Sequence, residues 1–200
     1  MQAKAGEART FTESARRAQI VAAAIDVIAD GGYASASFAA IARRAGLSST
    51  GLISYHFASK SDLMAQVAAE TYGALGAHMA DRMAAADGPA RALEAYIRGV
   101  TEFVAGHRRE MKAVLEIFLG GGISYTPGTE LVALSPVEEI LRTGQSAGEM
   151  RDFDTRVMAA VIQRAVDGLP FLLETHPDID PAAYADELVV TFTLATRSAP

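Results

Sequence analysis

A group of polar residues in the N-terminal third of the chain could make hydrogen bonds without carrying negative charge. The group consists of Ser49, Thr50, Gly51, Ser54, Tyr55 and His56, and it contains no Asp or Glu. Such side chains can donate to and accept from base edges in the DNA major groove, where a carboxylate would be repelled by the phosphates. The group therefore predicts a surface that contacts double-stranded DNA.

Enzyme chemistry has much less support in the sequence. The stretch 46–50 begins like the turn that carries a nucleophilic serine but lacks its closing glycine, and the glycines at 120–122 lack the lysine of a phosphate-binding loop. The chain has no cysteine, and no histidine follows a glutamate at the spacing of a di-iron helix bundle. We therefore expect no catalytic residue, no metal and no cofactor. A small all-α enzyme and a helical interaction protein without specific DNA binding are the alternative hypotheses.

Two short helices would place the polar group on one surface. Ser37 is a suitable N-cap, and Gly46 can adopt the positive φ that ends a helix. Between them an apolar stripe predicts a helix that is buried on one side, through Phe38, Ile41, Ala42 and Ala45. Ser48 or Ser49 would then cap a second helix, whose inward residues would be Leu52, Ile53 and Phe57. This order of elements predicts a helix-turn-helix.

Four short sequence motifs follow one another at characteristic spacing over about fifty residues. They are Gly31-Gly32-Tyr33, the stretch Ile41-Ala42-Arg43-Arg44-Ala45-Gly46-Leu47-Ser48, Tyr55-His56-Phe57, and Ser59-Lys60 with Leu63. In these pieces and their spacing the chain resembles the tetracycline-repressor (TetR) family of transcriptional regulators. It departs from the family pattern by having two serines in the turn, which makes the turn or the second helix one residue longer. It also has Ala40 where the family often has a charged group.

The resemblance implies a repressor that binds a palindromic operator. Carried over, it assigns base contacts to Thr50, Gly51 and Ser54, and backbone contacts to Tyr55, His56 and Lys60. Arg43 and Arg44 would touch phosphate, or else lie on a solvated helix face, and Tyr55 has the alternative of packing in the core. The expected DNA-binding set is completed by Ser37 and Ser49.

The charge of the chain agrees with this interpretation once it is divided. The net charge of the whole chain is −6. Residues 1–64 contain seven Lys or Arg against five Asp or Glu, a net charge of +2, and residues 65–200 contain eleven against nineteen, a net charge of −8. The basic part coincides with the predicted helix-turn-helix, as phosphate binding requires. Because the sequence has no signal-peptide core and no apolar run long enough to span a bilayer, we expect a cytoplasmic protein without a membrane partner.

The remainder of the chain has a helical pattern. We predict an all-α protein of about nine helices, with a disordered tail at 1–9, a DNA-binding domain at 10–60 and a ligand-binding and dimerisation domain at 61–200. Thr10 with Glu13 would cap the first helix, and the stretch 135–138 predicts the start of the seventh after an irregular segment. Pro170 is expected to bend an eighth helix that would span about residues 155–175.

The last two predicted helices contain more apolar residues than one buried face needs. A single helix-turn-helix reads few base pairs, so two copies are needed for specificity. As the resemblance implies, we expect a homodimer whose interface includes Val161, Leu172, Leu188 and Phe192. The alternative is that these residues fill the core of the subunit.

Bulky apolar and amphipathic residues also predict a pocket for a small organic inducer. They are Tyr96, Phe103, His107, Met111, Leu115, Phe118, Tyr125, Leu141 and Phe171. Ordinary core packing is the alternative for each of them. The glycines at 120–122 could serve as a mobile lid beside this pocket.

Overall fold

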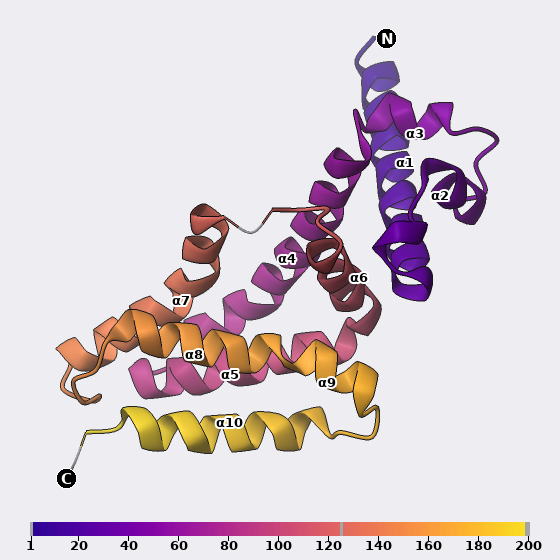
Figure 1. Ribbon diagram of the computed structural model, residues 1–200. Helices are drawn as coiled ribbons and strands as arrows, with labels where there is room; N and C mark the ends of the chain where they lie inside the picture. The colour runs from indigo at the N-terminus through magenta and orange to yellow at the C-terminus, as the bar shows by residue number, and fades with distance from the viewer. Residues whose placement is uncertain (1, 125, 199–200) are drawn as a thin grey trace. The chain divides into compact units, whose positions relative to one another are not determined.

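The computed structural model describes residues 2–124 and 126–198, with side chains from residue 12 onward. In this part of the chain every regular element is helical, and the one β-type pairing is an isolated bridge between Met150 and Arg197 (Figure 1). The predicted all-α class is confirmed. In the described backbone α1 begins at Gln2, before the start that we predicted at Thr10. The side chains of residues 1–11 are not described, and the disorder predicted for the tail at 1–9 stays a prediction.

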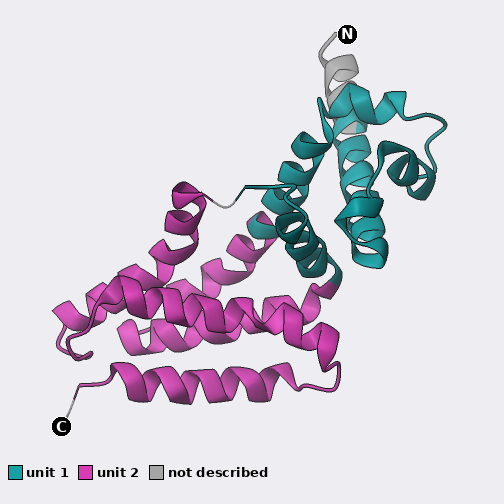
Figure 2. Ribbon diagram, viewed as in Figure 1, with its two compact units in different colours: residues 1–72, 109–124 teal, residues 73–108, 125–200 magenta. Residues whose placement is uncertain are grey.

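The chain divides into two compact units (Figure 2). Unit 1 contains residues 1–72 and 109–124, and unit 2 contains residues 73–108 and 125–200. These units are defined by packing. The functional domain boundary that we predict near residue 60 concerns activity and remains a prediction.

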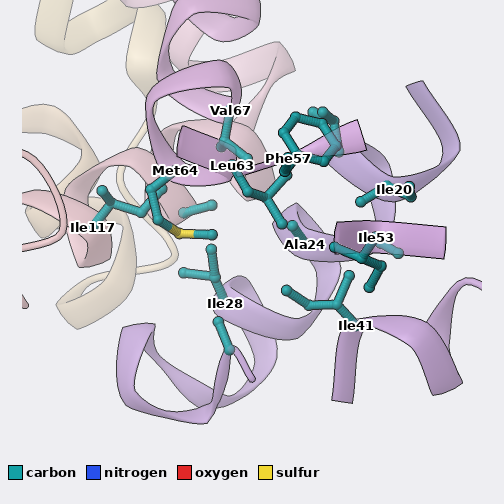
Figure 3. Close-up of a cluster of buried hydrophobic side chains, with 14 of the residues drawn as sticks. Ile20, Ala24, Ile28, Ile41, Ile53, Phe57, Leu63, Met64, Val67 and Ile117 are labelled. Carbon is teal, nitrogen blue, oxygen red and sulfur yellow. The ribbon is translucent and has the colours of Figure 1, made fainter. Parts of the chain in front are cut away.

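Unit 1 is built on α1 (Gln2–Gly31), the short 3₁₀ turn η1 (Tyr33–Ser35), α2 (Phe38–Arg44) and α3 (Gly51–His56). It also includes the first part of α4 (Lys60–Ala84) and most of α6 (Arg108–Leu119). Their apolar side chains meet in one buried cluster, drawn in Figure 3, that includes Ile20, Ile28, Ile41, Ile53, Phe57, Leu63 and Ile117. Since α2 and α3 each have only a few residues, this shared core, more than their own hydrogen bonds, keeps them folded.

Unit 2 contains the rest of α4 together with α5 (Pro89–Gly106), α7 (Pro127–Ser146), α8 (Thr155–Asp167), α9 (Leu169–Thr175) and α10 (Pro181–Thr196). In this unit α5 packs against α10 and α7, and α7 packs against α8. The connection that precedes α8 ends at Asp154, whose carboxylate accepts from the backbone N–H groups of Arg156 and Val157 at 3.0 Å. The C-terminal helix begins in the same way, with Asp180 as its N-cap.

The start of α7 differs from our prediction. The helix begins at Pro127, and Ser135 and Pro136 lie inside it. Thr126 caps it, because its hydroxyl accepts from the N–H of Thr129 at 3.2 Å while the Thr129 hydroxyl accepts from the N–H of Thr126 at 2.7 Å. Pro136 has no N–H for the carbonyl of Val132, and Figure 1 shows the helix bent along its length. Val132 is exposed, so water can reach the freed carbonyl.

The predicted eighth helix is present as two helices. Its first part is α8, and α9 begins after Gly168 with Pro170 in its first turn. A proline is tolerated in the first turn because no helical donor is needed there. The expected bend at Pro170 is thus a break between two helices.

Candidate DNA-binding site

The first helix of the predicted helix-turn-helix forms as the sequence indicates. Ser37 is the N-cap of α2, and its hydroxyl accepts from the N–H of Ala40 at 3.1 Å. The helix buries Ile41 and Ala42, and Gly46 follows it with a φ of 65°. Only a residue without a Cβ adopts that conformation at little cost, so the glycine fixes the direction of the turn.

The second helix, α3, starts later than we predicted. Thr50 occupies the N-cap position and makes no capping hydrogen bond with its side chain, so neither Ser48 nor Ser49 is the cap. Ile53 and Phe57 are buried as expected, but Leu52 is 37% exposed. A short helix buries only one apolar stripe. Leu52 directly precedes buried Ile53 and is therefore rotated by about 100° from that stripe, towards solvent.

The outward side of α3 carries the polar group. Ser49, Thr50, Gly51, Ser54 and Tyr55 are exposed, and His56 is half-buried. The Tyr55 side chain is 72% exposed, which excludes the core position that we considered for it. Its ring meets the His56 ring edge-on at a centroid distance of 4.9 Å. No carboxylate lies on α3 itself.

The two arginines of α2 differ in their surroundings. Arg43 is exposed, and among the described residues it makes no ion pair. Arg44 forms ion pairs with Asp30 and, at 3.4 Å, with Asp26. Arg109 of α6 joins the same two carboxylates at 2.9 Å each. Hydrogen bonds from Arg44 and Arg109 hold the pKa of Asp30 below its ordinary value.

Lys60, at the start of α4, is held by the turn that follows α1. Its Nζ donates to the carbonyl of Tyr33 at 3.0 Å and lies 3.9 Å from the centre of the Tyr33 ring. Partial desolvation lowers the pKa of Lys60. An ammonium group has three donors, so two remain for a phosphate after the bond to Tyr33.

The Tyr33 ring in turn lies on the glycines that we expected to form a lid. A Cβ at Gly120 would come within 2.2 Å of the Tyr33 side chain, and one at Gly122 within 2.6 Å. The glycines therefore allow the end of α6 to approach Tyr33 closely. This packing, within unit 1, differs from the mobile role that we predicted.

Arg17 of α1 contacts the end of α3, and the sequence did not indicate this. Its Nη1 donates to the carbonyl of His56 at 2.6 Å. Gln19 makes a similar bond to the carbonyl of Ala45, at the end of α2, at 2.7 Å. These contacts join residues far apart in the chain, and no local motif marks them.

Comparisons with known proteins agree with this geometry. Residues 20–67 match the family described as bacterial regulatory proteins, tetR family. The resemblance to the TetR family is thereby confirmed for this segment. The matched segment contains the end of α1, α2, α3 and the start of α4, and α2 with α3 forms its helix-turn-helix.

Several solved structures share the fold of this chain over nearly the whole length. A TetR-family regulatory protein from Rhodococcus RHA1 is 20% identical, with a TM-score of 0.76, and the match covers 92% of this chain and 98% of that one. The fatty acid degradation regulator FadR from Bacillus halodurans is 21% identical, with a TM-score of 0.77 and coverage of 89% and 94%. FadR from Bacillus subtilis, in complex with stearoyl-CoA, is 21% identical, with a TM-score of 0.75 and coverage of 88% and 96%. A comparison with curated sequences finds no significant match.

The residues predicted to line an inducer pocket lie in different parts of the chain. Tyr125 lies outside the described residues. In unit 2, Tyr96, Phe103 and Leu141 are buried, His107 is half-buried and Phe171 is exposed. The half-buried side chains of Met111, Leu115 and Phe118 belong to unit 1.

Within unit 2 the polar atoms near the predicted pocket are already engaged. The Tyr96 hydroxyl donates to Gln163 Oε1 at 2.6 Å, and Gln163 Nε2 donates to Asp167 at 2.8 Å. Burial raises the pKa of Tyr96 far above its ordinary value and also raises the pKa of Asp167. The Tyr96 oxygen can still accept a hydrogen bond from a bound molecule. The His107 ring stacks on Phe103 at a centroid distance of 4.0 Å.

The predicted interface residues also differ in exposure. Val161 on α8 is 53% exposed, whereas Phe192 on α10 is only 5% exposed and lies in the core of unit 2. Leu172 and Leu188 are half-buried. Beyond the predicted set, α8 exposes Val157, and α10 exposes Val190 and Leu194. Each helix therefore has an exposed apolar pair spaced four residues apart.

Two further observations concern metal binding and membrane insertion. Among the described residues, no group of His, Asp and Glu side chains is arranged to hold a metal ion. None of the helices in this part of the chain is long and apolar enough to cross a membrane.

Proposed function

We propose that this TetR-family regulator is a dimeric repressor that binds a palindromic operator and is released from it by a small lipophilic ligand. The observation that carries the proposal is the outward side of α3. It exposes hydroxyl groups and carries no carboxylate of its own, and buried Ile53 and Phe57 hold it in place. Such a helix can enter the major groove and contact base edges.

The DNA contacts follow from the exposure of individual side chains. Thr50, Gly51 and Ser54 face outward and would meet base edges, with Tyr55 and His56 beside the sugar-phosphate backbone. Ser37 and Ser49 lie at the edges of this surface. Among the cations, Arg43 is better placed to bind phosphate than Arg44, because two carboxylates already neutralise Arg44.

A second copy of the chain would cover the exposed apolar pairs of α8 and α10. Val157 with Val161, and Val190 with Leu194, are valine and leucine side chains more than half exposed to water. Burying such side chains on association is favourable, at about 25 cal/mol per Å². Two subunits related by a two-fold axis would also present two copies of α3 to a palindromic site.

A ligand with a long apolar part suits the buried side chains of unit 2. FadR from Bacillus subtilis, which has the same fold, is found in complex with stearoyl-CoA. The Tyr96–Gln163–Asp167 chain offers few polar atoms beside Phe103 and Leu141, which favours a mostly apolar molecule. By linkage, such a ligand must bind the DNA-free form more tightly by the same factor that it weakens DNA binding.

An electrophoretic mobility shift with the DNA that flanks the gene of this protein tests the proposal. We expect a retarded complex that unlabelled specific duplex removes and scrambled duplex of the same composition does not. Ser54→Ala should change which bases are preferred, whereas Arg43→Gln should weaken binding to all sequences equally. Equal competition by specific and scrambled duplexes would contradict the proposal and favour an interaction protein without sequence preference.

Release is tested by adding fatty acyl thioesters to the preformed complex. Any compound that raises the melting temperature of the free protein should also dissociate the complex with DNA. A compound that binds tightly and leaves the affinity for DNA unchanged would contradict the ligand-release part of the proposal and leave DNA binding intact.

A further inference from the structure

Arg17 holds the C-terminal end of α3 through three different groups. Its Nη1 donates to the carbonyl of His56 at 2.6 Å, and its Nη2 donates to Gln66 Oε1 at 3.1 Å. The guanidinium carbon also lies 4.4 Å from the centre of the Phe57 ring. Gln66 is fixed in turn, because its Nε2 donates to Glu70 at 2.9 Å. One planar group thus connects α1, α3 and α4 within unit 1.

Apart from buried Ile53 and Phe57, α3 has few contacts that fix its position, one of them the hydrogen bond that the Tyr55 hydroxyl donates to Glu13 Oε1 at 3.4 Å. The helix has six residues, and no side chain caps its N-terminal end. Isolated helices of this length are not stable in water, so tertiary contacts decide where it lies. The last carbonyls of a helix lack helical partners and carry partial negative charge, which a cation stabilises. Arg17 supplies that cation at His56, the last residue of α3.

We propose that Arg17 is a positioning residue that sets where α3 lies, and thereby the selection of DNA sequence. The proposal rests on the proposed function as a DNA-binding regulator. Contacts to base edges require a correct helix position to within a fraction of an ångström, whereas attraction to phosphates depends mainly on charge. Loss of Arg17 should therefore weaken binding to the operator more than binding to arbitrary DNA.

Arg16 provides a matched control on the same helix. It has the same charge, and its Nη1 donates to Gln19 Oε1 at 2.7 Å on α1 itself and not to α3. Arg17→Gln and Arg16→Gln remove one positive charge each, so a purely electrostatic effect on DNA binding should be similar in both. Arg17→Lys keeps the charge but lacks the planar fork that reaches His56, Gln66 and Phe57 together.

The experiment measures two properties of each full-length variant. The first is affinity for an operator, selected from random duplexes with the wild-type protein, compared with affinity for scrambled duplex. The second, which needs no DNA, is hydrogen exchange at the amides of Ile53, Ser54 and Phe57, which are bonded within α3. Exchange in α5 reports whether the remainder of the fold is intact.

We expect Arg17→Gln to bind the operator about tenfold more weakly than Arg16→Gln, as loss of a charged hydrogen bond would cause, with equal affinity for scrambled duplex. Exchange in α3 should become about tenfold faster while exchange in α5 is unchanged, and Arg17→Lys should fall between the two glutamine variants. Equal loss of affinity for both duplexes would overturn the proposal, because Arg17 would then act as a phosphate contact. Unchanged exchange in α3 would overturn it as well. If the wild-type protein selects no operator, the proposed function fails, and the exchange comparison still decides whether Arg17 positions α3.

Discussion

The contact between Tyr33 and Gly120 predicts that replacing this glycine by alanine lowers the stability of the protein. Gly120 does not have a positive φ, so its backbone conformation alone would accept alanine. A Cβ there would, however, come within 2.2 Å of Cδ1, 2.7 Å of Cγ and 2.8 Å of Cβ of Tyr33. These atoms lie near the root of the side chain, so a rotation of the ring cannot clear all of them. Gly120→Ala should therefore destabilise unit 1 by about 1–3 kcal/mol, the usual cost of overpacking.

Gly76 provides the matched control. It lies within α4, and a Cβ there would meet no atom within 4 Å. Gly76→Ala should stabilise the protein by about 0.5–1 kcal/mol, because glycine is a poor helix residue. The same chemical change should thus have opposite effects, with a difference between the variants of about 1.5–4 kcal/mol.

Urea denaturation of the two variants and the wild-type protein measures this difference. Tyr33→Ala removes the two atoms with the shortest distances, so Gly120→Ala should cost less in that background by about 0.5–3 kcal/mol, the range of coupling between contacting residues. If Gly120→Ala were as stable as Gly76→Ala, or cost the same with and without the Tyr33 ring, the proposed packing of Tyr33 on the end of α6 would be wrong.

Three further predictions concern charge, association and pH. Lys60→Met should weaken binding to all duplexes and reduce the slope of log affinity against log salt by about one, as measured by fluorescence anisotropy; an unchanged slope would mean that Lys60 serves only the turn after α1. Leu194→Glu should give a folded monomer in sedimentation velocity, because this side chain is 55% exposed. Phe192→Glu should instead unfold unit 2, because its side chain is 5% exposed. A dimeric Leu194→Glu variant would exclude that face of α10 as the dimer interface. The hydrogen bond from Arg44 is the main reason why the pKa of Asp30 is lowered in the folded state. Ionised Asp30 therefore stabilises the folded state at any pH above its ordinary pKa, and this stabilisation should be lost as the pH falls through the lowered pKa. The stability difference between the wild-type protein and Asp30→Asn should therefore be present at pH 7 and shrink below about pH 4, and a constant difference across this range would contradict the ion-pair assignment.

The helix-turn-helix could be predicted from the sequence because its determinants are local. The cap at Ser37, the positive φ at Gly46 and the inward stripe through Ile41 depend on residues within about one or two helical turns. The outward polar residues of α3 followed from the same periodicity. Where two local signals competed, the sequence was less informative. Ser135 with Pro136 has the pattern of a helix start, but α7 begins at Pro127 after the N-cap Thr126, whose capping partner Thr129 stands in place of the usual acid or amide.

Only the tertiary structure decided what the long charged side chains contact. Nothing near Lys60 in the sequence indicates its bond to the carbonyl of Tyr33, and nothing near Arg17 indicates its bond to the carbonyl of His56. The same holds for Arg44, which two aspartates on another helix neutralise. A long flexible side chain takes whichever partner the folded chain brings within reach, whereas caps and apolar stripes are set by neighbours a few residues away. The sequence by itself therefore determined which polar side chains α3 exposes, and the packing of α1, α4 and α6 around them determined which neighbouring cations already have partners within the chain.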